Sequence, residues 1–369
     1  MSQRPWGPPP PGNAPGRAPA GRNPYGYNPY GQAPQGWGGQ RGPATNPYGR
    51  PGLQPYGQPP RGPAPRGRSP IRALLMTGVV LGLLMVAALA VSNVADGGTS
   101  DTAYQNDNYQ VPPPDTSPPA LPQPETYDEA EQLLVANPFY RQATPTPVRC
   151  DADPIDVGDA SDSELEEHFS GLMECLVRVW QPPVEGARFQ IVRPTVTVYG
   201  EEITTRCGKS GVNAFYCGAD QQVYYSNLLD DAVPVVATDK WGADVVMAHE
   251  FGHALQARTA ILISSQALGQ QAGDESTELG LSRRLEVQAD CLSGMFLRSV
   301  SGSLRIEQSD VRGILDVYRA VGDDSVSGDA DIVGNHGLAR SREYWGQTGL
   351  NSGDVSACNT YTAKSNLVR

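Results

Sequence analysis

One uninterrupted apolar run divides the chain into parts that cannot share a fold. Ala73–Val91 contains nineteen residues without a charge, long enough for one helix to span a bilayer core. Arginines precede the run and aspartates follow it, so the positive-inside rule places the N-terminus in the cytoplasm. The leader is too long for a cleavable signal peptide. We therefore predict a single-pass protein of the cell membrane, with a transmembrane helix over residues 73–94 and everything after it outside the cytoplasm.

The segments that flank this span have compositions that disfavour a packed core. Residues 1–72 are rich in Pro, Gly, Tyr and Gln and repeat Asn-Pro-Tyr-Gly three times. Such a segment cannot bury enough apolar surface to offset its ordering entropy, so we predict a disordered cytoplasmic tail. Residues 95–148 are Pro-rich and predict a stiff, solvated extracytoplasmic linker. One short helix is expected within it, after a capping box at Thr126 and Glu129.

The folded domain is therefore expected over residues 149–369, and its charge limits its partners. The whole chain has a net charge of −12 although its tail is basic, so this domain is acidic. An acidic surface repels the phosphates of nucleic acids, which excludes nucleic acid as the expected partner.

All six cysteines follow the predicted span, and an even count there is typical of disulfides in an oxidising compartment. They are Cys150, Cys175, Cys207, Cys217, Cys291 and Cys358. Six cysteines allow fifteen pairings, and the sequence does not choose among them. We favour Cys150–Cys175, Cys207–Cys217 and Cys291–Cys358. Ligation of a metal by cysteine is the alternative, which the lack of a C-x-x-C pair disfavours.

Hydrophobic spacing over residues 149–369 predicts an α+β domain that is mostly helical with a small sheet. Helices are expected over 163–180, 241–256, 278–299 and 308–318. Strands are expected over 189–199, 214–217 and 222–226. A capping box at Ser163 and Glu166 would open the first helix, and Pro182-Pro183 would end it.

Two segments of the domain are expected to lack regular structure. The polar residues 264–277 would rim or cover a cleft, and the acidic residues 322–328 would be flexible and solvated. A strand that precedes the 241–256 helix would offer its edge to an extended peptide, and an ordinary structural sheet is the alternative.

The expected helix over 241–256 carries an H-E-x-x-H pattern at His249, Glu250 and His253. Residues four apart share a helix face, so the two imidazoles can bind one zinc ion. Glu250 lies where its carboxylate can serve as the general base for a metal-bound water. The alternative is chance occurrence on a core helix, which is rare in a chain with four histidines.

A third ligand is expected on the helix over 278–299. Glu286 and Asp290 are four residues apart and share a face. Glu286 would complete the zinc ligands, and Asp290 would accept the free N–H of a ligand histidine and fix its tautomer. A solvated acidic face is the alternative interpretation of this pair.

The other two histidines differ in their expected roles. His336, which precedes Arg340 and Arg342, could stabilise the oxyanion of a tetrahedral intermediate, or it could be a capping or packing residue. His168 lies near the apolar stripe of the 163–180 helix, and we interpret it as structural.

The domain resembles the bacterial putative neutral zinc metallopeptidase family over about 207–358. The resemblance rests on Cys207-Gly208, Phe215–Gln221, Ala248–His253, Glu286–Cys291, His336-Gly337 and Cys358. It implies a zincin-like fold, Zn²⁺ on His249, His253 and Glu286, and Glu250 as general base. Gly218, Ala254 and the Tyr344-Trp345-Gly346 segment depart from the usual family pattern without touching an expected ligand.

Together, the pattern and the resemblance predict a membrane-anchored zinc metallopeptidase that hydrolyses a protein or peptide substrate. The alternative from another class is a non-catalytic, membrane-tethered scaffold or envelope-binding domain with a structural or vestigial zinc site. Glu250 distinguishes the two, because a structural zinc site does not need a carboxylate beside an open coordination position.

Overall fold

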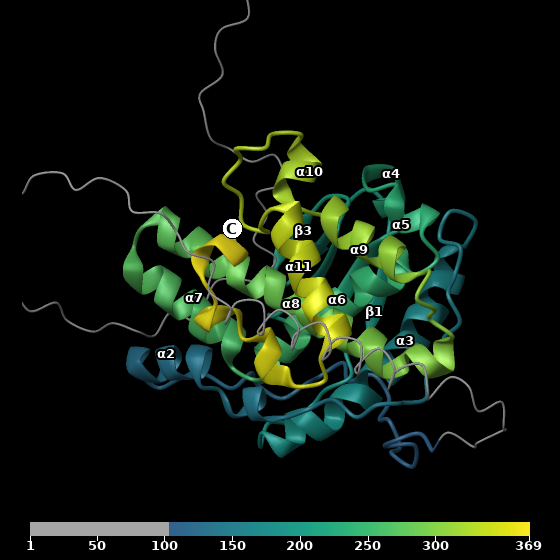
Figure 1. Cartoon of the computed structure of the whole chain (residues 1–369), viewed down its shortest axis with the longest axis horizontal. Coiled ribbons are helices and arrows are strands. Elements are labelled where there is room, and N and C mark those ends of the chain that lie inside the picture. Colours follow the sequence, from purple (N-terminus) through teal and green to yellow (C-terminus); the bar gives the residue numbers. More distant parts are fainter. Residues whose placement is uncertain (1–102) are drawn as a thin grey trace, which may run out of the picture. The chain divides into compact units, whose positions relative to one another are not determined.

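Helix α8 (Glu275–Leu304) is the element against which α6 (Gly242–Arg258), α7 (Ile261–Ala272) and α11 (Ala339–Asn351) pack. The structure is a computed structural model, and it describes residues 103–369. Figure 1 shows α6, α8 and α11 side by side. The tail predicted over 1–72 and the span predicted over 73–94 lie outside the described residues. Within residues 103–369, no helix is both long and apolar enough to cross a membrane.

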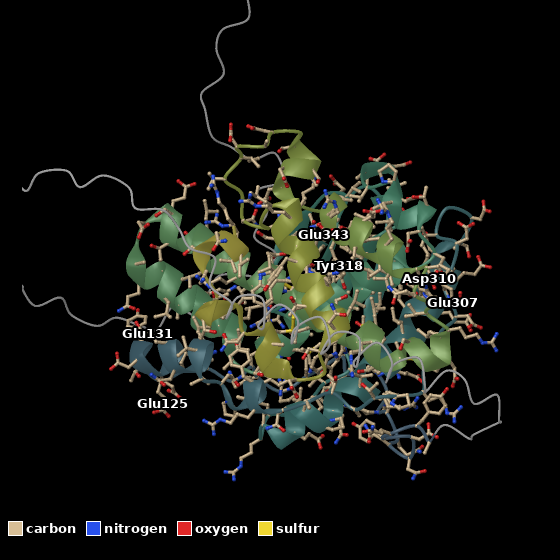
Figure 2. The ribbon with its side chains drawn as sticks, viewed as in Figure 1. Glu125, Glu131, Glu307, Asp310, Tyr318 and Glu343 are labelled. Atoms are coloured by element: carbon tan, nitrogen blue, oxygen red, sulfur yellow. A yellow bond between two sulfur atoms is a disulfide. The ribbon has the colours of Figure 1, made fainter. Side chains whose placement is uncertain are left out.

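The other helices surround this group. They are α2 (Tyr127–Val135), α3 (Asp162–Gly186), α4 (Leu229–Ala232), α5 (Val235–Thr238), α9 (Val311–Ala320), α10 (Asp323–Ser327) and the 3-10 turns Pro138–Arg141, Val355–Cys358, Thr360–Thr362 and Ser365–Leu367. Figure 2 shows Glu125 and Glu131 projecting outward near α2. Tyr318 of α9, by contrast, is fully buried. The predicted mostly helical domain with a small sheet is confirmed.

Two small sheets complete the fold. β5 (Gln222–Ser226) lies between β1 (Val196–Tyr199), which is parallel to it, and β4 (Ala214–Cys217), which is antiparallel with Phe215 opposite Tyr224. β2 (Ile203–Thr205) and β3 (Gly208–Ser210) form a separate antiparallel pair. The strands expected over 214–217 and 222–226 are confirmed, whereas the one expected from residue 189 begins only at Val196. Pro194 precedes it and has no N–H to contribute to a ladder.

A close approach between α6 and α8 brings the expected ligands together. Gly252 of α6 lies against Ala289 of α8, and a Cβ at position 252 would stand 3.0 Å from the Ala289 Cα. A larger residue at position 252 would therefore push the two helices apart. His249 and His253 flank this glycine on α6, while Glu286 and Asp290 flank Ala289 on α8.

The expected limits of α3 are wrong at both ends. The capping box is formed by Ser161 and Glu164, not by Ser163 and Glu166, and the helix continues through Pro182 and Pro183 to Gly186. Pro182 cannot donate to the carbonyl four residues earlier, that of Arg178. The side chain of Asn106 donates to this carbonyl at 2.8 Å instead.

The Pro-rich segment before α2 contacts the domain, unlike the solvated linker predicted from its composition. Arg258 donates to the Pro119 carbonyl at 3.0 Å, Arg193 to the Pro112 carbonyl at 3.3 Å, and Gln222 to the Asp115 carbonyl at 3.0 Å. An extended Pro-rich backbone has no internal hydrogen bonds, so its carbonyls are free to accept from side chains of the domain.

Both segments expected to lack regular structure are largely helical. Residues 264–277 supply most of α7 and the start of α8, so they do not form a loop over the cleft. Residues 322–328 contain α10, whose first residue, Asp323, is buried.

The described domain contains three disulfides, Cys150–Cys175, Cys207–Cys217 and Cys291–Cys358, and no free cysteine. These are the pairs favoured above. The first attaches the segment before α3 to that helix, the second closes the β2–β3 hairpin onto β4, and the third joins α8 to the C-terminal turns.

We expect the bridges to differ in their effect on stability. Cys291–Cys358 joins residues 67 positions apart and Cys207–Cys217 joins residues 10 apart. Loop-closure entropy predicts that replacing the first pair by alanine costs about 1.7 kcal/mol more than replacing the second. Urea unfolding of the two double variants under non-reducing conditions measures the difference. Equal losses, or a greater loss for Cys207–Cys217, would contradict it.

Candidate metal centre and catalytic cleft

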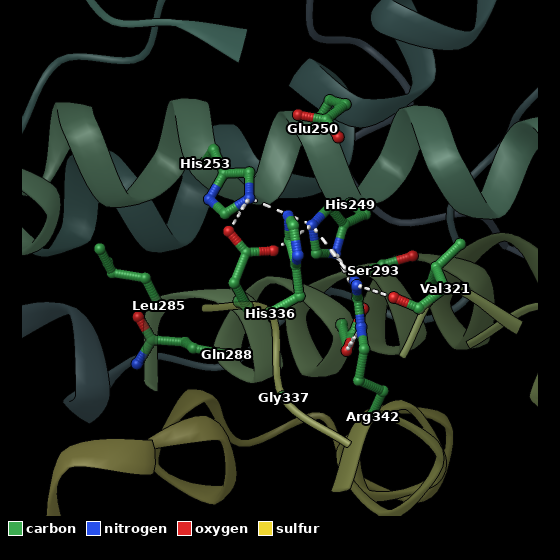
Figure 3. A network of polar contacts seen from close by, with 12 residues as sticks. His249, Glu250, His253, Leu285, Gln288, Ser293, Val321, His336, Gly337 and Arg342 are labelled. Carbon is green, nitrogen blue, oxygen red and sulfur yellow. Dashed lines mark hydrogen bonds and ion pairs between the residues drawn. The ribbon is translucent and has the colours of Figure 1, made fainter. Parts of the chain in front are cut away.

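Three buried side chains from α6 and α8 converge on one point (Figure 3). His249 Nε2 lies 3.1 Å from His253 Nε2 and 3.4 Å from Glu286 Oε2, and His253 Nε2 lies 3.6 Å from Glu286 Oε1. Tetrahedral ligands about 2.1 Å from a zinc ion are about 3.4 Å from one another. The donor types and the spacing of these three side chains therefore fit a zinc ion.

Each imidazole is oriented by a partner on its other nitrogen. His249 Nδ1 donates to Asp290 Oδ1 at 2.8 Å, and His253 Nδ1 donates to Gln256 Oε1 at 2.8 Å. The Gln256 amide in turn donates to the Leu285 carbonyl at 2.8 Å. With Nδ1 protonated on both rings, both Nε2 atoms present a lone pair to a metal.

Asp290 is held by a second buried residue. Arg342 of α11 donates to Asp290 Oδ2 through Nε and to Oδ1 through Nη2, both at 2.8 Å. Burial would raise the pKa of Asp290, but Arg342 and His249 together lower it below its usual value. Asp290 is therefore ionised and can accept the hydrogen bond from His249 Nδ1. Arg342 also lies 3.3 Å from His249 Nδ1.

Glu286 remains ionised for a similar reason. Burial would raise the pKa of its carboxyl, but the neighbouring His253 and His249 lower it well below its usual value. An ionised carboxylate beside two imidazoles provides the negative charge that a divalent cation requires in a buried site.

Glu250 points to the sheet side of the same cleft. Its Oε2 accepts a hydrogen bond of 2.9 Å from the Tyr216 N–H of β4. Burial raises the pKa of Glu250, while the charges of His249 and His253 act to lower it. The cleft encloses about 470 Å³. Its lining includes Glu250 and the three candidate metal ligands His249, His253 and Glu286.

His336 also lines this cleft, and Asp323 holds it there. Asp323 Oδ1 accepts from His336 Nδ1 at 3.1 Å, while its Oδ2 accepts from the backbone N–H of His336 at 3.1 Å and of Gly337 at 2.8 Å. The His336 side chain is 33% exposed and lines the cleft. His168 instead pairs with buried Asp244 at 2.7 Å and does not line the cleft, in agreement with a structural role.

Comparison with known proteins decides the family. The family model described as "Putative neutral zinc metallopeptidase" matches residues 142–361, more than half of the chain. The chain belongs to this family. Its zinc metallopeptidase pattern, H-E-x-x-H with a downstream Glu, coincides with the buried cluster of His249, His253 and Glu286.

The chain is also similar to proteins of Escherichia coli and Mycobacterium tuberculosis. "Uncharacterized protein YpfJ" of Escherichia coli strain K12 is 30% identical over 215 residues, which cover 54% of this chain and 73% of that protein. "Uncharacterized protein Rv2575" of Mycobacterium tuberculosis strain H37Rv is 28% identical over 208 residues, which cover 50% of this chain and 67% of that protein. No solved structure matches the chain.

Contacts in the cleft that were not anticipated from sequence include Arg342 with Asp290, Gln256 with His253 and Asp323 with His336. Gln256 follows His253 by three residues, a helical spacing that could have identified it as a partner of that histidine. Asp323 precedes His336 by thirteen residues, with a loop between them, so no periodic signal connects the two.

Proposed function

We propose that this chain is an extracytoplasmic zinc-dependent metallopeptidase, anchored in the cell membrane by residues 73–94, that hydrolyses peptide bonds in a protein or peptide substrate. Family membership supports the class of enzyme. The observation that carries the proposal is the buried group of three candidate metal ligands. Two of them are imidazoles whose Nδ1 atoms are hydrogen-bonded, which leaves Nε2 to bind a metal. The three disulfides support an oxidising compartment outside the cytoplasm.

In this proposal four side chains of the cleft bind the metal or move a proton. His249, His253 and Glu286 would hold a zinc ion. A bound zinc ion would polarise the scissile carbonyl and lower the pKa of a coordinated water towards about 7. Glu250 would accept the proton that the attacking water loses as the C–O bond forms on the scissile carbonyl, and would then deliver it to the leaving amine as the C–N bond breaks.

The edge of β4 is the proposed docking strand for the substrate. The Tyr216 N–H already faces Glu250, and alternate residues of a strand direct their N–H and C=O groups to the same side. The main-chain groups of Ala214, which also lines the cleft, therefore face it as well. An extended peptide paired with Ala214 would lie beside Glu250.

His336 is the proposed donor to the oxyanion that forms on the scissile carbonyl, and Asp323 is a positioning residue that acts through it. Because Asp323 accepts from Nδ1, the His336 Nε2 is left to face the reacting group. Protonated Nε2 can donate to a developing negative charge, a contribution that is made chiefly in the transition state.

We expect Asp323→Asn to lower kcat by about tenfold to hundredfold with little change in KM, because His336 loses its fixed orientation. The matched control is Asp324→Asn in the same helix, because Asp324 accepts from the Ala339 N–H and does not line the cleft. In a His336→Ala background, Asp323→Asn should have no further effect on kcat. Additive losses in the double variant would show that Asp323 does not act through His336.

The proposed function is tested by zinc content and peptide-library cleavage on the purified full chain. We expect one zinc ion per chain and cleavage that a chelator abolishes and added zinc restores. Zinc-loaded protein that cleaves nothing in a diverse library would favour the scaffold instead.

A further inference from the structure

One part of the cleft has an apolar wall that the proposed chemistry does not use. It lies at the N-terminal end of α6, where α5 and α9 pack against that helix and α4 packs against α5. The wall is formed by Leu229, Val233, Val236, Val246, Val317 and Val321. Val246 lies one helical turn before Glu250, so the wall is continuous with the candidate catalytic site.

Each charged side chain that lines the cleft either has a partner of opposite charge or belongs to the candidate metal centre. Among residues 103–369, the acidic and basic side chains that line it are Glu250, Glu286, Asp290, Asp323 and Arg342. Asp290 pairs with Arg342 and Asp323 with His336, while Glu250 and Glu286 belong to the candidate metal centre. The wall itself therefore offers no partner to a charged side chain, which would lose its hydration there without compensation.

An exposed apolar side chain at the margin of the same cleft leads to the same conclusion. Val326 of α10 is 43% exposed and lines the cleft. An apolar occupant would remove Val326 and the partly buried wall residues Val233 and Val246 from water together, and this burial favours binding in proportion to the area covered. The cleft volume of about 470 Å³ is within the range of ligand pockets and exceeds what one side chain needs.

We propose that this wall is a substrate subsite for a large apolar side chain, aliphatic or aromatic, on a residue that flanks the cleaved bond. The inference rests on the proposed peptidase function and deepens it, because it names the class of peptide that the site selects. Val246 and Val233 are the specificity-determining residues, since both are only partly buried on the wall and remain accessible to an occupant.

Cleavage of a peptide library by the zinc-loaded full chain tests the subsite. We expect kcat/KM to be at least about 100-fold greater for peptides with Leu or Phe beside the cleaved bond than for peptides with Asp or Ala there. Val246→Phe, which narrows the subsite, should shift the preference towards Ala by at least tenfold. Val233→Asp should reduce cleavage beside Leu and increase it beside Lys or Arg.

The matched control is Val135→Asp, because Val135 is also 43% exposed but lies on α2, outside the cleft. It should leave the preference unchanged. Cleavage without any preference between Leu and Asp, or a preference that neither cleft variant alters, would overturn the subsite while leaving the peptidase function intact.

Binding to the zinc-loaded Glu250→Gln chain separates the two hypotheses. If wild-type protein cleaves nothing, the proposed function fails, and the affinities for uncleaved Leu and Asp peptides still test the wall. We expect the Leu peptide to bind at least tenfold more tightly, and the difference to disappear in a Val233→Asp background. Equal affinities for the two peptides would refute the subsite.

Discussion

Glu250→Gln is expected to lower kcat for peptide cleavage by about 10²–10⁴-fold, the usual contribution of a general base. Glutamine has nearly the same shape as glutamate and its amide oxygen can still accept the Tyr216 N–H, so the fold and the contact with β4 should persist. It cannot take a proton from the attacking water. Steady-state kinetics on zinc-loaded protein, with zinc content determined for each preparation, measures the loss.

A matched control for this variant is Glu278→Gln, because Glu278 is an exposed glutamate on α8 that does not line the cleft. It should retain wild-type activity. If Glu250→Gln retained zinc and kept its activity within threefold of wild type, Glu250 would not be the base, and another group would have to accept the proton.

The second large effect is expected for Glu286→Ala, which removes the proposed zinc ligand on α8. Loss of a residue that merely orients a ligand typically weakens metal binding about 10–100-fold, so loss of the ligand itself should weaken it by more than about 100-fold. Competition with a chromophoric chelator measures the affinity. Glu278→Ala, on the same helix, should bind zinc as the wild type does.

Zinc-dependent stability provides an independent measurement for the same variant. At a free zinc concentration of 100 times its Kd, the wild type should gain about 2.7 kcal/mol in its free energy of unfolding. A variant that binds 100-fold more weakly should gain about 0.4 kcal/mol at that concentration. Comparison of each protein with and without zinc cancels the effect of removing a buried charge. An unchanged gain would exclude Glu286 from the metal centre.

Local patterns were sufficient to predict much of this site. The spacing of His249 and His253 requires a shared helix face, and the same holds for Glu286 and Asp290. Strands β4 and β5 were predicted at their observed residues because aromatic residues are concentrated on both sides of the turn residues 218–221. These features depend on residues within one or two turns of one another.

Predictions failed where a distant contact overrides a local preference. Pro182 was expected to end α3, but Asn106, 72 residues before Arg178, satisfies the carbonyl that the proline leaves free. The Pro-rich segment was expected to be solvated, but Arg258 binds its Pro119 carbonyl across a separation of 139 residues. Neither partner can be identified from the composition of the segment it contacts.

Helical periodicity was enough to identify the residues that could hold a zinc ion, because it places them on two helix faces without knowledge of the fold. Their convergence depends on the packing of α6 against α8, which no local pattern contains. The contact of Gly252 with Ala289, the pairing of Arg342 with Asp290 and the attachment of His336 to Asp323 join separate elements. The reason is that periodicity constrains neighbours along the chain, whereas the shape and charge of the cleft arise from packing between elements far apart in it.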